Sequence, residues 1–194
     1  MLRRLLTWLK RGFCRQPQRE EFPPVFFLRI AKVQRWQPDE TGKSPTVDEA
    51  VADLTLRPNE RGLSLYKLHK EGEEDELACV YSLALRDNPG HFEYILFPAS
   101  LLSGYRVDLV PVDEHPRFLS ERHHEIHEPS QEQLLQLAER ILNSPDKKVR
   151  RIMKQHIVNF AVQYALLETG ELRGRVNTRW QALIEKKKRT GTSE

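Results

Sequence analysis

The hydrophobic periodicity of the chain changes near residue 129, and this change restricts the fold more than any other feature. Before it, short apolar runs at residues 24–35, 63–68, 92–97 and 105–110 are separated by turns rich in Pro, Gly and Asn. After it, apolar residues recur every three or four positions, as on the buried face of a helix. We therefore expect an α+β protein with a small mixed sheet and short helices, followed by a C-terminal three-helix region.

The length of the chain favours one core with appendages. With 194 residues, of which 39% are hydrophobic, it is short for two domains of ordinary size. We expect a basic amphipathic helix and linker at residues 1–21, an α+β domain at 22–128, and a helical region with a basic tail at 129–194. No apolar run approaches the roughly 20 residues that cross a bilayer. Two widely spaced cysteines fit neither a disulfide framework nor a metal motif, which favours the cytoplasm.

Several local signals predict where helices begin. Thr46 with Glu49, and Ser130 with Gln133, have the spacing of capping boxes. Pro145 suits the first position of the longest predicted helix, which would run to about residue 167. The apolar run at residues 77–85 is compatible with either a helix or a buried strand, and periodicity does not decide between them.

Charge is strongly segregated along the sequence. Residues 1–19 carry six Lys or Arg and no acid, and residues 147–194 carry twelve bases and four acids. The segment between them has 13 bases and 24 acids, which gives it a net charge of −11. Either the basic ends meet an anionic partner, or they pack on the acidic body of the same chain.

The C-terminal basic residues are the candidate contact with nucleic acid or an acidic partner. Those in the first part of the segment would crowd the first turns of the predicted long helix, where positive charge opposes the helix dipole. This local cost suggests a functional reason for their placement. The candidate residues are Lys147, Lys148, Arg150, Arg151, Lys154, Arg173, Arg175 and Arg179.

The first 13 residues suggest a second interaction surface. Their apolar side chains lie at helical spacing, with most basic residues elsewhere on the predicted helix. Such a helix can dock in a groove of a protein or lie in a membrane interface, and a single short helix binds bilayers weakly. We therefore favour docking to a partner. The apolar face comprises Leu2, Leu5, Leu6, Leu9 and Phe13.

A histidine cluster offers the most direct route to a metal site. On a helix, His123 and His127 would project from one face, as in zinc sites, and His115 could add a third ligand. The glutamate that zinc proteases carry after their first histidine is replaced by His124. On a strand, His123, Glu125 and His127 would share a face instead. The alternative interpretation is a polar surface segment without a metal.

Other residues of the central block are candidates for an enzymatic site. Arg57 and Arg61 flank a turn and could present guanidinium groups to a phosphate. The turn could instead simply connect two elements, with Gly62 in a left-handed conformation. Tyr66, Tyr81 and His69 could join such a site if neighbouring elements align. The motifs of nucleotide-binding loops, α/β-hydrolases and zinc proteases are all missing.

These observations favour a non-catalytic function. We expect a subunit or adaptor of a larger bacterial complex, with the N-terminal helix contacting a protein and the basic C-terminal helices contacting nucleic acid or an acidic partner. The sequence calls for no cofactor. Two alternatives remain: a small hydrolase or nucleic-acid-modifying enzyme with its site in the central block, and a peripheral membrane protein bound through the N-terminal helix.

Overall fold

The computed structural model describes residues 25–56, 60–68, 73–113, 115, 117–163 and 175–191. The predicted N-terminal docking helix and linker, Arg57, His69 and Arg173 lie outside these residues, so their roles remain predictions.

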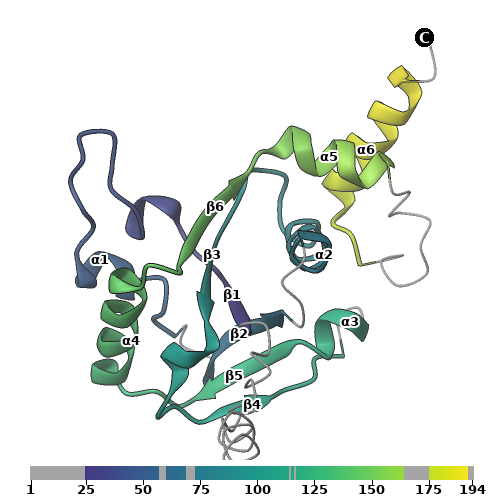
Figure 1. Cartoon of the computed structure of the whole chain (residues 1–194). Helices are drawn as coiled ribbons and strands as arrows, with labels where there is room; N and C mark the ends of the chain where they lie inside the picture. Colours follow the sequence, from purple (N-terminus) through teal and green to yellow (C-terminus); the bar gives the residue numbers. More distant parts are fainter. Residues whose placement is uncertain are drawn as a thin grey trace, which may run out of the picture.

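One antiparallel sheet of six strands forms the centre of the described structure, in the order β4-β5-β2-β1-β3-β6 (Figure 1). All five strand pairings are antiparallel, although the sequence favoured a mixed sheet. The α+β class is confirmed. The strands are β1 (Phe26–Ile30), β2 (Gly62–Leu68), β3 (Phe92–Pro98), β4 (Val107–Leu109), β5 (His123–His127) and β6 (Lys148–Ile152).

Helices cover both faces of this sheet (Figure 1). One face packs against α1 (Val47–Val51) and α4 (Gln131–Asn143), together with two short 3-10 turns, Val33–Arg35 and Ala99–Leu102. The other face packs against the remaining helices. These are α2 (Glu73–Ala84), α3 (Arg117–Ser120), α5 (Lys154–Gln163) and α6 (Thr178–Gly191).

The two faces are buried because successive strand residues point in opposite directions. On β1, Phe26 and Leu28 enter the core beneath α2, whereas Phe27 enters the core beneath α4. On β3, Tyr94 and Ile95 divide in the same way. Central strands buried on both faces have near-continuous apolar runs, which explains why their sequences alternate so little.

The predicted helix starts after residues 46 and 130 are confirmed. In each case the hydroxyl of the N-cap accepts a hydrogen bond from the third helical N–H, at 3.2 Å for Thr46 and 3.1 Å for Ser130. The side chains of Glu49 and Gln133 accept the reciprocal bond from the N-cap N–H, at 2.7 and 2.8 Å. The undecided apolar run at residues 77–85 lies largely in helix α2.

The predicted long helix from Pro145 is wrong in its first part. Residues Lys148–Ile152 form strand β6, which pairs with β3 at the edge of the sheet, and α5 begins only at Lys154. On this strand Val149 packs in the core beneath α4, while Ile152 packs in the core beneath α2. A strand thus buries apolar side chains on both faces of the sheet, and it leaves Lys154 as the one predicted cation of residues 147–154 at the N-terminus of α5.

Gly62 is required for close packing rather than for a left-handed turn. Among the described glycines, Gly42 and Gly104 have positive φ and Gly62 does not, which corrects the expectation for this position. A Cβ atom at Gly62 would lie 2.9 Å from Glu125 Cβ and 3.1 Å from the carbonyl oxygen of Ile126. The absent side chain therefore allows β2 and β5 to approach each other at this point.

We expect the substitution Gly62→Ala to lower the free energy of unfolding by about 1–3 kcal/mol, because backbone or Cβ atoms must shift to admit the methyl group. Gly90→Ala is the matched control, since the nearest atom to its added Cβ is 3.9 Å away. Urea denaturation of the two variants measures the difference. Equal stability of both variants would contradict the role assigned to Gly62.

Candidate functional site

The two arginines of β6 form ion pairs with acidic side chains of the same chain. Arg150 forms an ion pair at 2.9 Å with Glu76, a buried carboxylate that also accepts a 2.7 Å hydrogen bond from the Tyr94 hydroxyl. Burial, followed by this hydrogen bond, raises the pKa of Tyr94. Arg151 contacts Glu93 at 2.5 Å. These pairs fit the interpretation in which the basic residues pack on the acidic part of the same chain.

The lysines on either side of these arginines are also partly engaged. The ammonium group of Lys147 donates a 2.5 Å hydrogen bond to the Leu142 carbonyl, and burial lowers its pKa. Lys148 lies 5.0 Å from the centre of the Phe26 ring, a cation–π distance. Lys154 is exposed at the start of α5. The predicted basic surface of residues 147–154 is therefore not a row of exposed cations on one helix.

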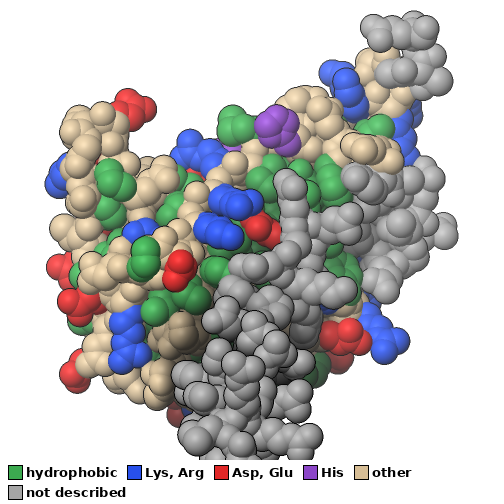
Figure 2. Space-filling model, in the orientation of Figure 1, with side chains coloured by type: hydrophobic (Ala, Val, Ile, Leu, Met, Phe, Trp, Pro, Cys, Tyr) green, Lys and Arg blue, Asp and Glu red, His purple; other side chains and the backbone are tan. Residues whose placement is uncertain are grey.

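Helix α6 carries a different group of cations. We call Lys186, Lys187, Lys188 and Arg189 the basic end of α6. They follow the buried residues Trp180 and Ile184, which attach the first half of the helix to the core. In Figure 2, Lys and Arg side chains lie along α6 at the upper right, apart from the group near the centre, where basic and acidic side chains are adjacent.

Two of the predicted arginines, Arg179 in α6 and Arg175 just before it, have specific partners. Arg179 donates a 3.1 Å hydrogen bond to the side chain of Asn88, beyond the end of α2. Arg175 donates to the backbone carbonyl of His115. Both contacts join the C-terminal segment to parts of the chain that are distant in sequence.

The histidine cluster lies on strand β5, not on a helix. Residues four apart on a strand are about 13 Å apart, so His123 and His127 do not converge on one metal ion. His123 Nδ1 lies 2.7 Å from the Val110 carbonyl oxygen, and His127 Nε2 lies 3.2 Å from a carboxylate oxygen of Asp108. Across the described residues, no group of three or more His, Cys, Asp or Glu side chains could hold a metal ion.

Of the other candidates in the central block, those that the structure describes do not converge on a single site. Tyr81 is buried in the core and stacks on Phe160 with 3.8 Å between ring centroids. Arg61 is exposed just before β2. Tyr66, in contrast, lies at the floor of a cleft.

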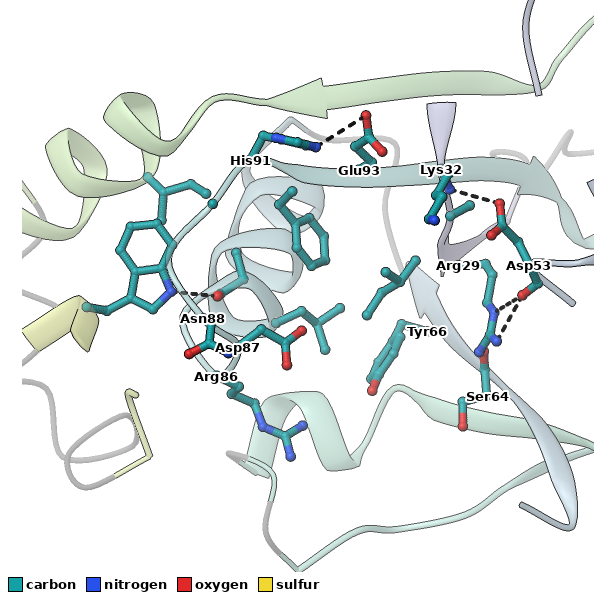
Figure 3. A pocket seen from close by; sticks show the side chains of 18 of the residues that line it. Arg29, Lys32, Asp53, Ser64, Tyr66, Arg86, Asp87, Asn88, His91 and Glu93 are labelled. Atoms are coloured by element: carbon teal, nitrogen blue, oxygen red, sulfur yellow. Dashed lines mark hydrogen bonds and ion pairs between the residues drawn. The ribbon is translucent and has the colours of Figure 1, made fainter. Parts of the chain in front are cut away.

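This cleft has a volume of about 1010 Å³ and lies at one end of the sheet (Figure 3). Its walls come from the end of β1, the segment after α1, β2, the beginning of β3, the end of α2, α5 and the start of α6 with the segment before it. Its polar lining is mixed in charge. The charged side chains that line it are Arg29, Lys32, Asp53, Glu60, Arg86, Asp87, Glu93 and Arg175.

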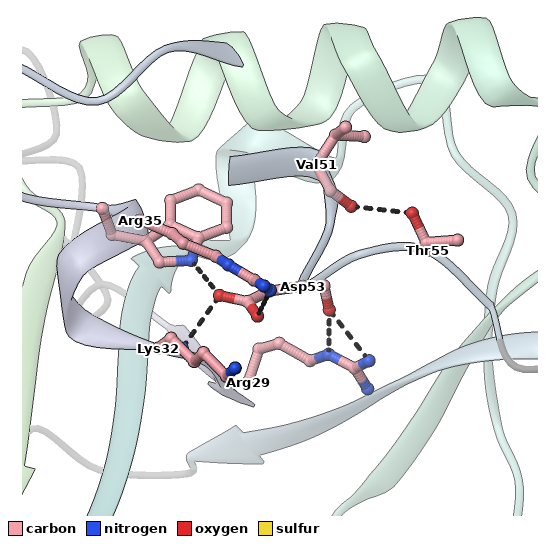
Figure 4. A network of polar contacts seen from close by, with 7 residues as sticks. Arg29, Lys32, Arg35, Val51, Asp53 and Thr55 are labelled. Atoms are coloured by element: carbon pink, nitrogen blue, oxygen red, sulfur yellow. Dashed lines mark hydrogen bonds and ion pairs between the residues drawn. The ribbon is translucent and has the colours of Figure 1, made fainter. Parts of the chain in front are cut away.

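At one side of the cleft, Asp53 is the centre of a hydrogen-bond network (Figure 4). Its carboxylate accepts bonds from Arg35 at 2.6 Å, from the indole N–H of Trp36 at 2.8 Å and from the backbone N–H of Lys32 at 2.8 Å. Its backbone carbonyl accepts two bonds from Arg29. The network fixes the segment after α1 against the end of β1, which is a structural role.

Tyr66 lines the other side of the cleft, and the rings of two histidines outside the cleft lining pack beside it. The centroid of the Tyr66 ring is 5.9 Å from that of His115 and 5.3 Å from that of His123. Burial, with smaller contributions from Arg86, His123 and Arg175, lowers the pKa of His115 to about 4. Burial raises the pKa of Tyr66, an effect that Arg86 opposes.

The sequence singled out part of this cluster and missed the rest. Tyr66, His115 and His123 were candidates, but for a metal or enzymatic site, and Arg86 was not considered. No local signal identifies Arg86, because it follows α2 as one cation among many. Only the packing of the α2 end against the β2–β5 pair brings it near Tyr66.

Comparison with known proteins gives no further guide to this cleft. The chain matches no family model, no curated protein and no solved structure.

Across the described residues, none of the helices has the length and apolar character needed to span a membrane.

We expect Asp53→Asn to lower the free energy of unfolding by about 3 kcal/mol, because Arg35 loses its charged partner and one acceptor becomes a donor. Asp146→Asn, at an exposed position, is the control and should change stability by less than about 0.5 kcal/mol. Chemical denaturation at neutral pH tests both. A loss at position 53 no larger than at position 146 would contradict the importance of the network.

Stability should also fall as the pH is lowered from 6.5 to 4, in part through His115. In this interval the unfolded chain protonates His115, with its ordinary pKa of 6.5, while the folded protein keeps the imidazole neutral. His115→Gln should remove about 2 kcal/mol of the pH-dependent change. Denaturation of wild type and variant across this interval measures it, with His91→Asn, at an exposed histidine, as control. An unchanged pH profile in His115→Gln would contradict the assignment.

Proposed function

We propose that this protein is a non-catalytic subunit or adaptor of a larger complex that contacts nucleic acid through the basic end of α6. The observation that carries the proposal is four consecutive cations on a helix whose first half is fixed to the core. This retains nucleic acid as a partner expected from the sequence, and it moves the contact from the eight basic residues predicted between positions 147 and 179 to residues 186–189.

The way α6 is attached supports this proposal. The indole N–H of Trp180 donates a 3.0 Å hydrogen bond to the Ala84 carbonyl, and the Trp180 side chain is 1% exposed. Ile184 is fully buried one turn later. The last turns therefore continue from a rigid base, and Figure 1 shows α6 leading away from the sheet toward the C-terminus.

The electrostatic balance of α6 also supports it. Among residues 178–191 the only acid is Glu185, against Arg179 and the four cations of the basic end. Lys186 and Lys187 are exposed, and no acidic side chain of the described residues lies within ion-pair distance of either. Cations at a helix C-terminus also complement the helix dipole, so this placement is compatible with a stable helix. Phosphate groups along a nucleic acid backbone match such a cluster.

The remaining parts of the proposal rest on the sequence. The apolar face of residues 2–13 would contact a protein of the same complex. The two widely spaced cysteines favour the cytoplasm as its compartment.

We expect the wild-type protein to bind duplex DNA with an affinity that falls steeply with added salt. Replacing all four cations of the basic end by glutamine should reduce the slope of log K against log salt by about 2 to 4, at roughly 0.9 per lost phosphate contact. Fluorescence anisotropy at several salt concentrations measures the slope.

The matched control removes four exposed positive charges elsewhere: Lys43, Arg61, Arg106 and Arg117, each replaced by glutamine. It has the same net charge as the α6 variant and should keep a slope within about one unit of wild type. Similar loss in both variants would show that net charge alone drives binding. That result, or binding insensitive to salt, would overturn the proposal.

A further inference from the structure

The second half of α6 continues past the core that holds its first half. Trp180 and Ile184 are buried on one stripe of the helix, and Leu183 packs beside them. Lys187 lies on the same stripe, because it follows Trp180 by seven positions and Ile184 by three. Its side chain is nevertheless exposed. The described core therefore ends between residues 184 and 187, while the helix continues to Gly191.

The part of α6 beyond the core keeps its helical form. The Thr190 hydroxyl donates hydrogen bonds to the carbonyl oxygens of Lys187, at 3.0 Å, and Lys186, at 3.3 Å, as threonine does within a regular helical turn. Residues 185–191 include no apolar side chain. At 1.5 Å per residue, this part of the helix is about 10 Å long. It is a short polar rod whose base is fixed by the core.

The cations of the basic end of α6 lie on more than one side of this rod. Consecutive residues are about 100° apart around a helix axis, so Arg189 is about 200° from Lys187. Lys187 is on the stripe that faces the core lower down, and Arg189 is therefore on nearly the opposite side. Both side chains are exposed, as is that of Lys186. Positive charge thus surrounds the helix end instead of forming one basic face.

This two-sided charge favours an anionic partner that encloses the helix. A flat anionic surface touches one side of a helix and leaves the cations of the opposite side in solvent. A groove with phosphate groups along both walls contacts both sides. The major groove of B-form DNA is about 12 Å wide and about 8.5 Å deep. A helix with its side chains is about 10–12 Å across, so the width and length of this rod match that groove.

Other grooves of nucleic acid duplexes fit the rod less well. The minor groove of B-form DNA is about 6 Å wide, which is too narrow for a helix. The major groove of an A-form RNA duplex is deep and narrow, and its minor groove is wide but shallow. Neither RNA groove places phosphate walls on both sides of an inserted helix.

We propose that the basic end of α6 inserts into the major groove of B-form duplex DNA, where cations on its opposite sides contact phosphates of both strands. This inference rests on the proposed function and adds the form of the nucleic acid and the groove. Phosphate contacts carry no sequence information, so binding should tolerate changes of base sequence.

The first test compares three duplexes of one sequence by fluorescence anisotropy with the full chain at constant salt. They are DNA, RNA, and DNA whose cytosines are replaced by glucosylated 5-hydroxymethylcytosine, which fills the major groove. We expect the RNA and the glucosylated DNA to bind at least about fivefold more weakly than plain DNA.

The result separates this inference from the function on which it rests. Equal affinity for the three duplexes would overturn insertion into the major groove. Nucleic acid binding through α6 would then still hold if replacement of all four cations of the basic end lowers the salt slope. Binding that is unaffected by that replacement would overturn both.

The second test locates the groove with dimethyl sulfate, which methylates guanine N7 in the major groove and adenine N3 in the minor groove. A saturating amount of the protein should reduce methylation at guanine N7 and leave adenine N3 unchanged, because these atoms lie in different grooves. Protection of adenine N3 alone, or of neither atom, would overturn the proposal.

The third test examines the two sides of the helix separately. Lys187→Gln and Arg189→Gln should each weaken binding to duplex DNA by about fivefold at ~0.1 M salt, because each loses about one phosphate contact. Lys43→Gln, at an exposed lysine in a loop, is the matched control and should stay within about twofold of wild type. Thermal melting of the variants establishes that each is folded. Loss of affinity in only one of the two α6 variants would indicate contact on one side and overturn insertion into a groove.

Discussion

Burial of both faces of the β1–β3 pair is the constraint on which the rest of the structure depends. Because successive apolar side chains of these strands point to opposite faces of the sheet, both faces must be shielded from water. Helices must cover both, and the chain supplies α1 and α4 to one face and α2, α5 and α6 to the other. The cleft lies where this cover ends, at the termini of β1, β2 and β3. Polar side chains can line the cleft because the two apolar layers between sheet and helices end there.

The elements that could be predicted from the sequence are those determined by neighbouring residues. The capping boxes at Thr46 and Ser130 are reciprocal bonds between residues three apart, so their spacing alone identifies them. Strand β6 could not be identified in this way. Its conformation depends on pairing with β3 and on ion pairs such as Arg150 to Glu76, whose partners lie more than 70 positions apart. Val149 and Ile152 are three positions apart, and this spacing fits one face of a helix as well as the two opposite faces of a strand. Only the burial of both sheet faces decides for the strand.

The cluster around Tyr66 was beyond sequence reasoning for a related reason. Tyr66 and His123 are directly opposite in the β2–β5 pairing, and the register of that pairing has no signal in either strand alone. His115 and Arg86 join them through the packing of two further segments. The segregation of charge is compatible with two alternatives. For Arg150 and Arg151 the internal alternative holds, while the basic end of α6 retains the potential for an external partner.

The attachment of α6 to α2 has a consequence for synthesis of the chain. A helix leaves its last carbonyl groups without internal partners. At the end of α2, the Ala84 carbonyl accepts its bond from Trp180 and the Leu85 carbonyl from the backbone N–H of Asn177. Val176 and Ile184 enter the same core. A ribosome must therefore have released the chain past residue 184 before α2 is fully capped and this core is closed, so all six strands of the sheet are synthesised before the core beneath α2 can close.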